Sequence, residues 1–235
     1  MANPTITSNG GGLLLGVNLA GAEFGTPNHV PGVFGTDYIY PTHTEIDYYA
    51  AKGMSVVRLP FLWERLQHSE NGPLDGAELA RLDDVVSYTT GKGLKIEIEP
   101  HNYGYGFGAL IGSAQTPNAA FADLWGKLAF HYQSNPSVIF GLMNEPHDQS
   151  ASVWLGSANA AIAAIRAAGA SQEILVPGSY WDGHGRGRPR TTPPSSAPAF
   201  KTLRTILRSR FISISTPMAA AHMPASCRPR SASSG

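Results

Sequence analysis

The stretch VIFGLMNEPHD, residues 138–148, ends a largely apolar run of six residues in Asn144, Glu145 and Pro146. A short apolar run of this kind is typical of a strand that is buried on both faces. The polar residues would then lie where the strand leaves the core. Polar groups also end the other strands that the sequence predicts, and this repetition indicates the fold.

Strand patterns and helix patterns alternate from residue 13 to residue 179. The expected strands are residues 13–21, 54–61, 94–102, 138–146 and 173–179, and the expected helices are 45–53, 76–93, 121–133 and 151–168. Repeated β-then-α alternation predicts a parallel sheet that is covered by helices.

Two architectures contain such a sheet. A doubly wound sheet usually has a Gly-rich phosphate turn after its first strand. Here the strand ends carry Arg58, Glu99 with His101, and Asn144 with Glu145 instead. The βα loops of a (β/α)8 TIM barrel lie on one face and build its site there. We therefore predict an α/β fold of the (β/α)8 type that is incomplete, with about five of the eight βα units recognisable.

The net charge of the chain changes from negative to positive near residue 183. All 17 acidic residues lie at or before Asp182, whereas residues 184–235 hold eight Arg and one Lys. A hydrophobic content of 42% excludes a purely disordered chain. We expect an N-terminal leader segment at 1–12, a partial barrel domain at 13–183, and a basic tail rich in Arg, Pro and Ser at 184–235.

The basic tail has three interpretations. It is a natural disordered segment, an out-of-frame or artificial terminus, or an arm that binds nucleic acid. The abrupt change of composition favours the second. Basic charge without aromatic residues or a known module is weak support for the third, so no nucleic-acid partner is predicted.

The rarer residue types exclude several kinds of site. Cys227 is the only cysteine, so no intrachain disulfide and no Cys-based metal site is possible. The eight His show no HExxH motif or paired spacing, so no metal site is predicted. No run reaches the ~18 apolar residues of a membrane span, and the first residues lack the signal-peptide pattern. No membrane partner is predicted.

Glu145 is the candidate for acid–base chemistry. It follows a buried run, so its carboxyl is expected at the rim of a low-dielectric core, which favours the neutral acid. A carboxylic acid in this state suits glycoside cleavage as the proton donor. Asn144 would offer an amide to a sugar 2-hydroxyl. Alternatively, Asn144 and Glu145 only begin a turn or cap the helix at 151–168.

Arg58 lies inside an apolar strand and needs a carboxylate partner, because an unpaired buried charge is costly. Glu99 and Glu145 are the candidates for that partner. A role for Arg58 in holding a catalytic carboxylate ionised is favoured over a purely structural pair. His101 is either a core histidine or a hydrogen-bond donor to substrate and carboxylate, and the second interpretation is favoured.

Aromatic residues follow several of the strand ends, where their faces suit the apolar faces of pyranose rings, although each alone fits core packing as well. Trp125 and Trp154 lie on expected helices and are assigned to the core. The candidates near substrate are Tyr38, Tyr40, Trp63, Tyr103, Tyr105, Phe107 and Trp181.

With these residues in place, the chain resembles glycoside hydrolase family 5, and within it the bacterial and fungal endo-β-1,4-glucanases. The resemblance covers roughly residues 13–183. The matching pieces are GVNLAGAEFG (16–25), VVRLPFLWERLQ (56–67), HNYGYG (101–106), VIFGLMNEPHD (138–148) and ILVPGSYWDG (174–183). The combination in this order is far more specific than Asn-Glu-Pro alone.

The resemblance implies a role for each matching residue. Glu145 is the implied general acid/base, Asn144 its neighbour at the 2-hydroxyl, and Arg58 and His101 polar residues around the nucleophile and the −1 sugar. The predicted substrate-binding set is Arg58, His101, Asn144, Tyr103, Trp63 and Trp181.

The family retains anomeric configuration, so a second carboxylate is required about 5–5.5 Å from the first. In the family this nucleophile is a Glu at the end of the seventh strand. No Asp or Glu follows Asp182 in this chain, so the nucleophile stays unknown. Glu99 lies on the correct face, but the resemblance gives it no such role.

The expected function is that of an endo-β-1,4-glucanase, or cellulase, acting by a retaining double displacement on β-1,4-glucan. This chain is expected to be impaired or inactive. The alternatives are a β-mannanase or other family 5 β-glycanase, and a non-catalytic glucan-binding remnant. No cofactor is expected, because the acid, the base and the nucleophile are all carboxyl groups.

The resemblance also implies an extracellular, secreted protein, although no signal peptide is recognised in this chain. We expect a monomer if the chain folds, with a tendency to associate if the barrel stays open.

Overall fold

The computed structural model describes residues 14–25 and 30–179 of the chain. The leader segment at 1–12, the basic tail at 184–235 and Trp181 lie outside these ranges. No helix of the described part is long and apolar enough to cross a bilayer.

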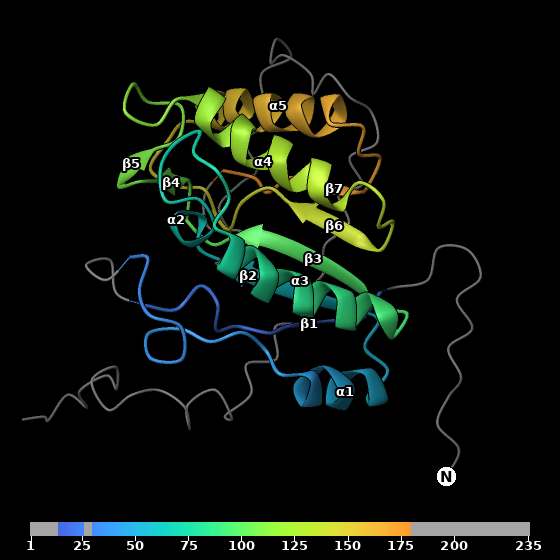
Figure 1. The fold of residues 1–235 in the computed structure, drawn as a ribbon. Coiled ribbons are helices and arrows are strands. Elements are labelled where there is room, and N and C mark those ends of the chain that lie inside the picture. Colours follow the sequence, from blue (N-terminus) through green and yellow to red (C-terminus); the bar gives the residue numbers. More distant parts are fainter. Residues whose placement is uncertain (1–13, 26–29, 180–235) are drawn as a thin grey trace, which may run out of the picture.

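A parallel sheet of five strands forms the centre of the molecule (Figure 1). Its strands, in spatial order, are β1 (Gly16–Asn18), β2 (Val56–Phe61), β3 (Lys95–Pro100), β6 (Val138–Gly141) and β7 (Ile174–Leu175). Each strand pairs with the one that precedes it in this series, and the order never reverses. A doubly wound sheet would show a reversal, so the order is that of a barrel.

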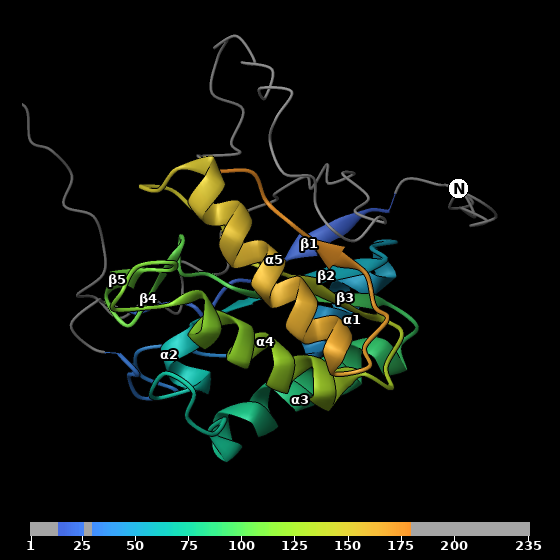
Figure 2. The ribbon, with the colours of Figure 1, turned by 90° about the horizontal axis from the view of Figure 1, so that it is seen from above.

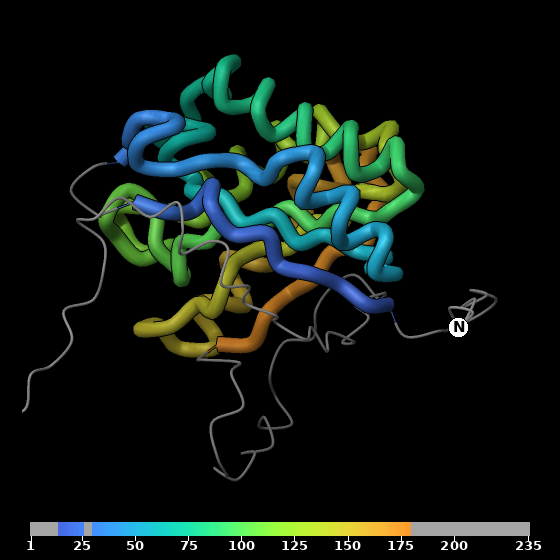
Figure 3. Tube along the Cα trace, turned by 90° about the horizontal axis from the view of Figure 1, so that it is seen from below, coloured from blue at the N-terminus to red at the C-terminus, as the bar shows by residue number. Residues whose placement is uncertain are grey.

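Helices cover one side of this sheet. They are α1 (His43–Ala51), α3 (Gly76–Gly91), α4 (Asn118–Tyr132) and α5 (Ala151–Ala167). Right-handed crossovers between successive strands of unreversed order place the connecting helices on one face. Figure 2 shows α3, α4 and α5 together on that side, and Figure 3 shows β1 and β7 on the side away from α3. The sheet therefore curves around its other face.

Side-chain caps lie at the starts of α1, α3 and α5. Thr42 and Glu45 form a reciprocal capping box at the start of α1. Asp75 accepts a hydrogen bond from the Glu78 amide at α3, and Ser150 accepts one from the Val153 amide at α5. These caps lie close to the helix starts that the sequence predicts.

Strand alternation separates two environments. In β2 and β3, Val57, Leu59, Ile96 and Ile98 are fully buried and belong to the main hydrophobic core. Alternate residues point to opposite faces of a strand, so Arg58, Glu97 and Glu99 share the other face. The face that curves inward is thus polar on β2 and β3.

Three short elements were not predicted from the sequence. They are α2 (Trp63–Leu66), directly after β2, and the antiparallel pair β4 (Tyr105–Gly106) and β5 (Ala109–Leu110), which lies in the loop after β3. The predicted strands 13–21, 138–146 and 173–179 are shorter in the structure, because only their middle or first residues join the ladder.

Candidate active site

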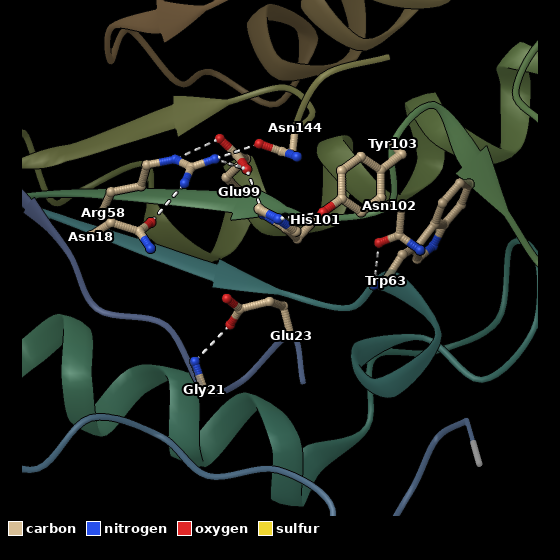
Figure 4. A network of polar contacts seen from close by, with 10 residues as sticks. All are labelled: Asn18, Gly21, Glu23, Arg58, Trp63, Glu99, His101, Asn102, Tyr103 and Asn144. Atoms are coloured by element: carbon tan, nitrogen blue, oxygen red, sulfur yellow. Dashed lines mark hydrogen bonds and ion pairs between the residues drawn. The ribbon is translucent and has the colours of Figure 1, made fainter. Parts of the chain in front are cut away.

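Arg58, in the middle of β2, connects β1, β3 and the segment after β6. Its Nε donates to Glu99 Oε2 at 2.9 Å and its NH2 group donates to Glu99 Oε1 at 2.5 Å, a bidentate pair. The guanidinium also donates to the Asn18 side-chain oxygen at 2.6 Å and to that of Asn144 at 2.8 Å (Figure 4). Of the two carboxylates considered as its partner, the structure pairs Arg58 with Glu99.

The contact with Arg58 fixes the orientation of Asn144. Its side-chain oxygen accepts from Arg58, so its NH2 group is left to donate elsewhere. The backbone amide of Asn144 donates to the carbonyl of Pro100 at 3.1 Å, which ties the segment after β6 to the end of β3. An amide donor held in this way can meet a sugar hydroxyl without first reorienting.

His101 lies beside the same carboxylate. Its Nδ1 is 3.3 Å from Glu99 Oε1, and its Nε2 is 3.2 Å from the hydroxyl of Tyr103. The two rings meet edge to face with centroids 5.1 Å apart. His101 thus lies between Glu99 and Tyr103 in polar surroundings, although its Nδ1 makes no hydrogen bond within the described part of the chain.

Glu145 lies beyond the strand itself. β6 ends at Gly141, and Glu145 has a positive φ of 36°, which is unusual for a residue other than glycine. Such backbone conformations cluster at functional sites. Glu145 is half-buried. Burial, followed by the nearby Glu145 charge, raises the pKa of the Tyr103 hydroxyl, so the two side chains lie within electrostatic reach of one another.

Hydrogen bonds to Glu64 in α2 hold the loop that follows β3 in place. Glu64 accepts hydrogen bonds from the Phe107 amide at 2.8 Å and from the Asn102 side chain at 2.7 Å. Asn102 in turn accepts from the Trp63 amide at 3.0 Å. Tyr103 and Phe107 both have positive φ angles in this loop. The loop is therefore a constrained support for Tyr103.

The prediction that Trp63 contacts substrate is wrong for this structure. Trp63 has no exposed surface and belongs to the hydrophobic core. Its indole N–H donates to Gln67, and its ring packs against Phe107 and Phe121. It also fills the space beside Gly106, where any side chain would collide with it. An aromatic residue after a strand has the same sequence signature in a groove and in a core.

Tyr38 and Tyr40 are also core residues. Both are buried, and both hydroxyls donate to the buried Glu78, at 2.7 and 2.9 Å. Burial, followed by the hydrogen bond to Glu78, raises the pKa of Tyr38 to about 12. Trp125 and Trp154 lie in the core, as predicted.

Three charged residues near the site were not assigned a role from the sequence. Glu23 lies in the loop after β1, Arg65 in α2, and Glu97 on β3 directly opposite Arg58 in the strand register. Glu23 and Arg65 fall inside matching family pieces but show no periodic signal, because they lie in a loop and a single helical turn. The alternation of β3 could have indicated Glu97.

Glu97 is an unusual acid because it is 3% exposed and its Oε2 has no hydrogen-bond partner among the described residues. It lies against Gly141, where a larger residue would collide with its carboxyl. Burial, and then the charge of Glu99, raises the pKa of Glu97 to about 8. The folded chain therefore keeps a proton on Glu97 at pH values where an ordinary carboxyl has lost it.

This raised pKa predicts how stability depends on pH. Between pH 4.5 and 8 the unfolded chain releases the Glu97 proton and the folded chain keeps it, so the free energy of unfolding falls as pH rises. Glu97→Gln abolishes this dependence. Urea denaturation at pH 5 and pH 8 measures the change. The free energy of unfolding of the variant should rise relative to that of its parent, on the order of a few kcal/mol at the higher pH.

Glu70→Gln, in the loop between α2 and α3, is the matched control and should follow the parent at both pH values. If Glu97→Gln and the parent show parallel pH dependence, Glu97 does not carry the proton.

Metal ligands are not grouped in the part of the chain that the structure covers. No three His, Cys, Asp or Glu side chains there lie close enough together to hold a metal ion. The donors at the site are carboxyl, amide, imidazole and phenol groups.

The sequence model of the family described as Cellulase (glycosyl hydrolase family 5) matches residues 17–206. The chain belongs to this family. The match extends past residue 183, where we placed the domain boundary, and that boundary stays a prediction. Family membership, together with the five parallel strands of unreversed order, confirms the predicted (β/α)8-type fold.

Several relatives of this family 5 chain are named endoglucanases. This chain is 43% identical over 169 residues to endo-β-1,4-glucanase B of Aspergillus niger, and the match covers 72% of this chain and 49% of the relative. It is 44% identical over 168 residues to endoglucanase 1 of Saitozyma flava, covering 70% and 48%. The chain spans about half the length of the curated relatives it matches.

Solved structures give the same family. The endo-β-1,4-glucanase Xac0029 of Xanthomonas axonopodis pv. citri matches with a TM-score of 0.70 and 44% identity, covering 72% of this chain and 54% of that one. A structure of XacCel5A in complex with cellopentaose matches with a TM-score of 0.69 and 44% identity, covering 71% and 53%.

Proposed function

We propose that this family 5 chain carries the acid/base half of an endo-β-1,4-glucanase site. The observation that carries the proposal is the Arg58 network, which holds Asn144 and Glu99 at the end of the sheet. Glu145 follows Asn144 directly in the chain, which places it at the same end. Relatives named endo-β-1,4-glucanases and a relative solved with cellopentaose support a β-1,4-glucan as the substrate.

The chemistry is a retaining double displacement. In the first step a carboxylate attacks the anomeric carbon, the glycosidic C–O bond breaks, and Glu145 gives its proton to the leaving oxygen. In the second step Glu145, now a carboxylate, takes a proton from water as that water attacks the anomeric carbon and releases the nucleophile. The Asn144 amide donates to the sugar 2-hydroxyl in both steps.

Glu99 is a poor candidate for the attacking carboxylate. Both of its oxygens accept from Arg58, and its side chain is almost fully buried. No Asp or Glu follows Asp182. We therefore propose that these 235 residues bind glucan but turn it over slowly or not at all, with no cofactor involved.

Two measurements test this proposal. The purified chain should be retarded in native gels that contain a soluble β-1,4-glucan, and Glu145→Gln should be retarded equally, because the amide keeps the shape of the acid. Release of reducing ends from carboxymethyl-cellulose should stay at the background level. Release at the rate of a full-length relative would contradict the predicted loss of turnover, and its abolition by Glu145→Gln would still support the acid/base role.

One alternative gives a different outcome in the same gels. A β-mannanase predicts stronger retardation by a β-mannan than by a β-1,4-glucan. A non-catalytic glucan-binding remnant predicts the same retardation as the proposed half-site, and it is separated from that half-site only by residual cleavage that Glu145→Gln abolishes. If neither polymer retards the chain, the proposal that it recognises a glucan is wrong.

The place of action and the state of association are also proposed. Insoluble and polymeric glucans cannot enter a cell, so we propose that the protein acts outside it, as expected of a secreted family member. We propose that the chain is a monomer when the sheet edges are covered and that it associates through β1 and β7 when they are not.

A further inference from the structure

The loop between β1 and α1 places a second carboxyl group near the polar network. Glu23 is half-buried in this loop, and Figure 4 shows it on the opposite side of the network from Asn144. Arg58 and His101 lie within electrostatic reach of the Glu23 carboxyl. The Glu23 charge in turn acts on Tyr103. Glu23 and Glu145 therefore both lie within electrostatic reach of Tyr103.

By distance and angle, one oxygen of Glu23 accepts a hydrogen bond within the described part of the protein, and the backbone amide of Glu23 also acts on the carboxylate. Oε2 accepts from the backbone amide of Gly21 at 2.7 Å. Oε1 has no such bond, and it is not one of the buried side-chain atoms that lack a partner. One oxygen thus anchors the side chain, and the other is available to a ligand.

The buried Arg65 holds the backbone on both sides of Glu23. Its guanidinium donates to the carbonyl oxygens of Ala22 and Phe24, and its Nε donates to that of Pro31 at 2.6 Å. Arg65 is 2% exposed. A side chain on Gly25 would come within 2.6 Å of the guanidinium, so glycine is required there.

The contacts of the buried Arg65 guanidinium fix the loop that carries Glu23. Removing a guanidinium from water is costly, and Arg65 donates to carbonyl groups of a single loop rather than to a carboxylate partner. The result is that the peptide group before Glu23 and the peptide group after Phe24 are both fixed. Binding groups work best when their neighbours hold them in place before the ligand arrives. The arrangement is that of a positioned binding group rather than a loose surface acid.

We propose that Glu23 Oε1 accepts a hydrogen bond from a glucosyl hydroxyl group bound at the same mouth as Asn144 and Glu145. The proposal rests on the proposed function, because it takes β-1,4-glucan as the ligand. Sugar hydroxyls donate, and a carboxylate is their strongest acceptor. Glu23 is then a substrate-binding residue and takes no part in proton transfer.

The test is cellopentaose binding by the 235-residue chain, measured by isothermal titration calorimetry at pH 7. Glu23→Gln keeps an oxygen for the Gly21 amide but offers the sugar an NH2 group, which cannot accept. We expect it to weaken binding roughly 10-fold or more, as for loss of a hydrogen bond to a charged group.

Asp37→Asn is the matched control. Asp37 accepts from the Val33 amide at 2.7 Å in the same loop, but it is not among the residues of the polar network. Its substitution should leave cellopentaose binding unchanged. Thermal unfolding of each variant shows whether a loss of affinity reflects loss of the fold.

A pH series on the parent chain gives a second readout. Burial is the largest effect on Glu23 and raises its pKa, so protonation begins above the range of an ordinary carboxyl. The affinity of the parent for cellopentaose should fall as the pH decreases from 7 toward 4.5. The affinity of Glu23→Gln should fall less, because the variant has no carboxyl group at this position to protonate. The other titratable or charged groups within electrostatic reach of Glu23 are His101, Tyr103, Arg58 and Arg65, and both proteins contain all four.

The outcomes separate the two proposals. Equal cellopentaose affinity of Glu23→Gln and its parent, with the same pH profile, would overturn the role of Glu23 and leave glucan recognition intact. Absence of binding by the parent itself would overturn both. Loss of affinity in Asp37→Asn as large as in Glu23→Gln would show that the loop, rather than the Glu23 carboxylate, determines binding.

Discussion

Replacing Arg58 by Met is expected to lower the free energy of unfolding by about 3–5 kcal/mol, the usual effect of removing one partner from a buried ion pair. Glu99 would be left almost fully buried without its bidentate donor. Asn18 and Asn144 would lose the same cation. Urea denaturation at pH 7, followed by circular dichroism, measures the change.

A double variant shows where this loss originates. Arg58→Met combined with Glu99→Gln removes the uncompensated charge and should recover much of the stability. Lys92→Ala breaks the exposed pair between Lys92 and Asp47 and should change stability little. A loss for Arg58→Met no larger than that for Lys92→Ala would show that the buried pair is not important for stability.

Replacing Arg65 by Met should have an effect of similar size. Three backbone carbonyl groups would lose their donor. The carbonyl of Ala22 is buried, and a buried acceptor left unsatisfied costs about 1–3 kcal/mol. The cation also stacks on the Tyr38 ring, 3.8 Å from its centroid. We expect a loss of about 3–5 kcal/mol in the free energy of unfolding.

Arg81 provides the matched control for Arg65. It lies over the Phe34 ring at 4.3 Å and donates to Glu78, but its side chain is 32% exposed. Glu78 is buried but keeps its hydrogen bonds from Tyr38 and Tyr40 without Arg81, so Arg81→Met should cost about 1 kcal/mol. Equal losses for the two variants in the same denaturation experiment would mean that the carbonyl contacts of Arg65 add nothing.

Arg58 shows how far sequence reasoning reaches into the site. A cation inside an apolar strand predicts a carboxylate partner, and the structure contains one. The choice between Glu99 and Glu145 could not be made in advance, because it depends on the strand register. In that register Arg58 stands opposite Glu97, with Glu99 two residues further along the same face.

Trp63 shows where sequence reasoning fails. Its burial depends on one turn of helix and a two-residue hairpin strand. Segments this short contain about one period of either structure, so no repeating hydrophobic pattern can predict them. Arg65 and Glu23 were missed for the same reason, since their roles depend on loop carbonyls that come together only in the folded chain. The longer elements were predicted because each contains several periods.

The unreversed strand order also has a kinetic consequence. Each parallel strand pairs with the strand synthesised just before it, as Val57 does with Val17 and Ile96 with Val57, roughly 40 residues apart each time. The entropic cost of closing the loop between two paired strands is therefore moderate and similar throughout the sheet. A nascent chain can add one strand at a time to a template that already exists, so we expect the sheet to grow from β1 toward β7 while the ribosome is still translating.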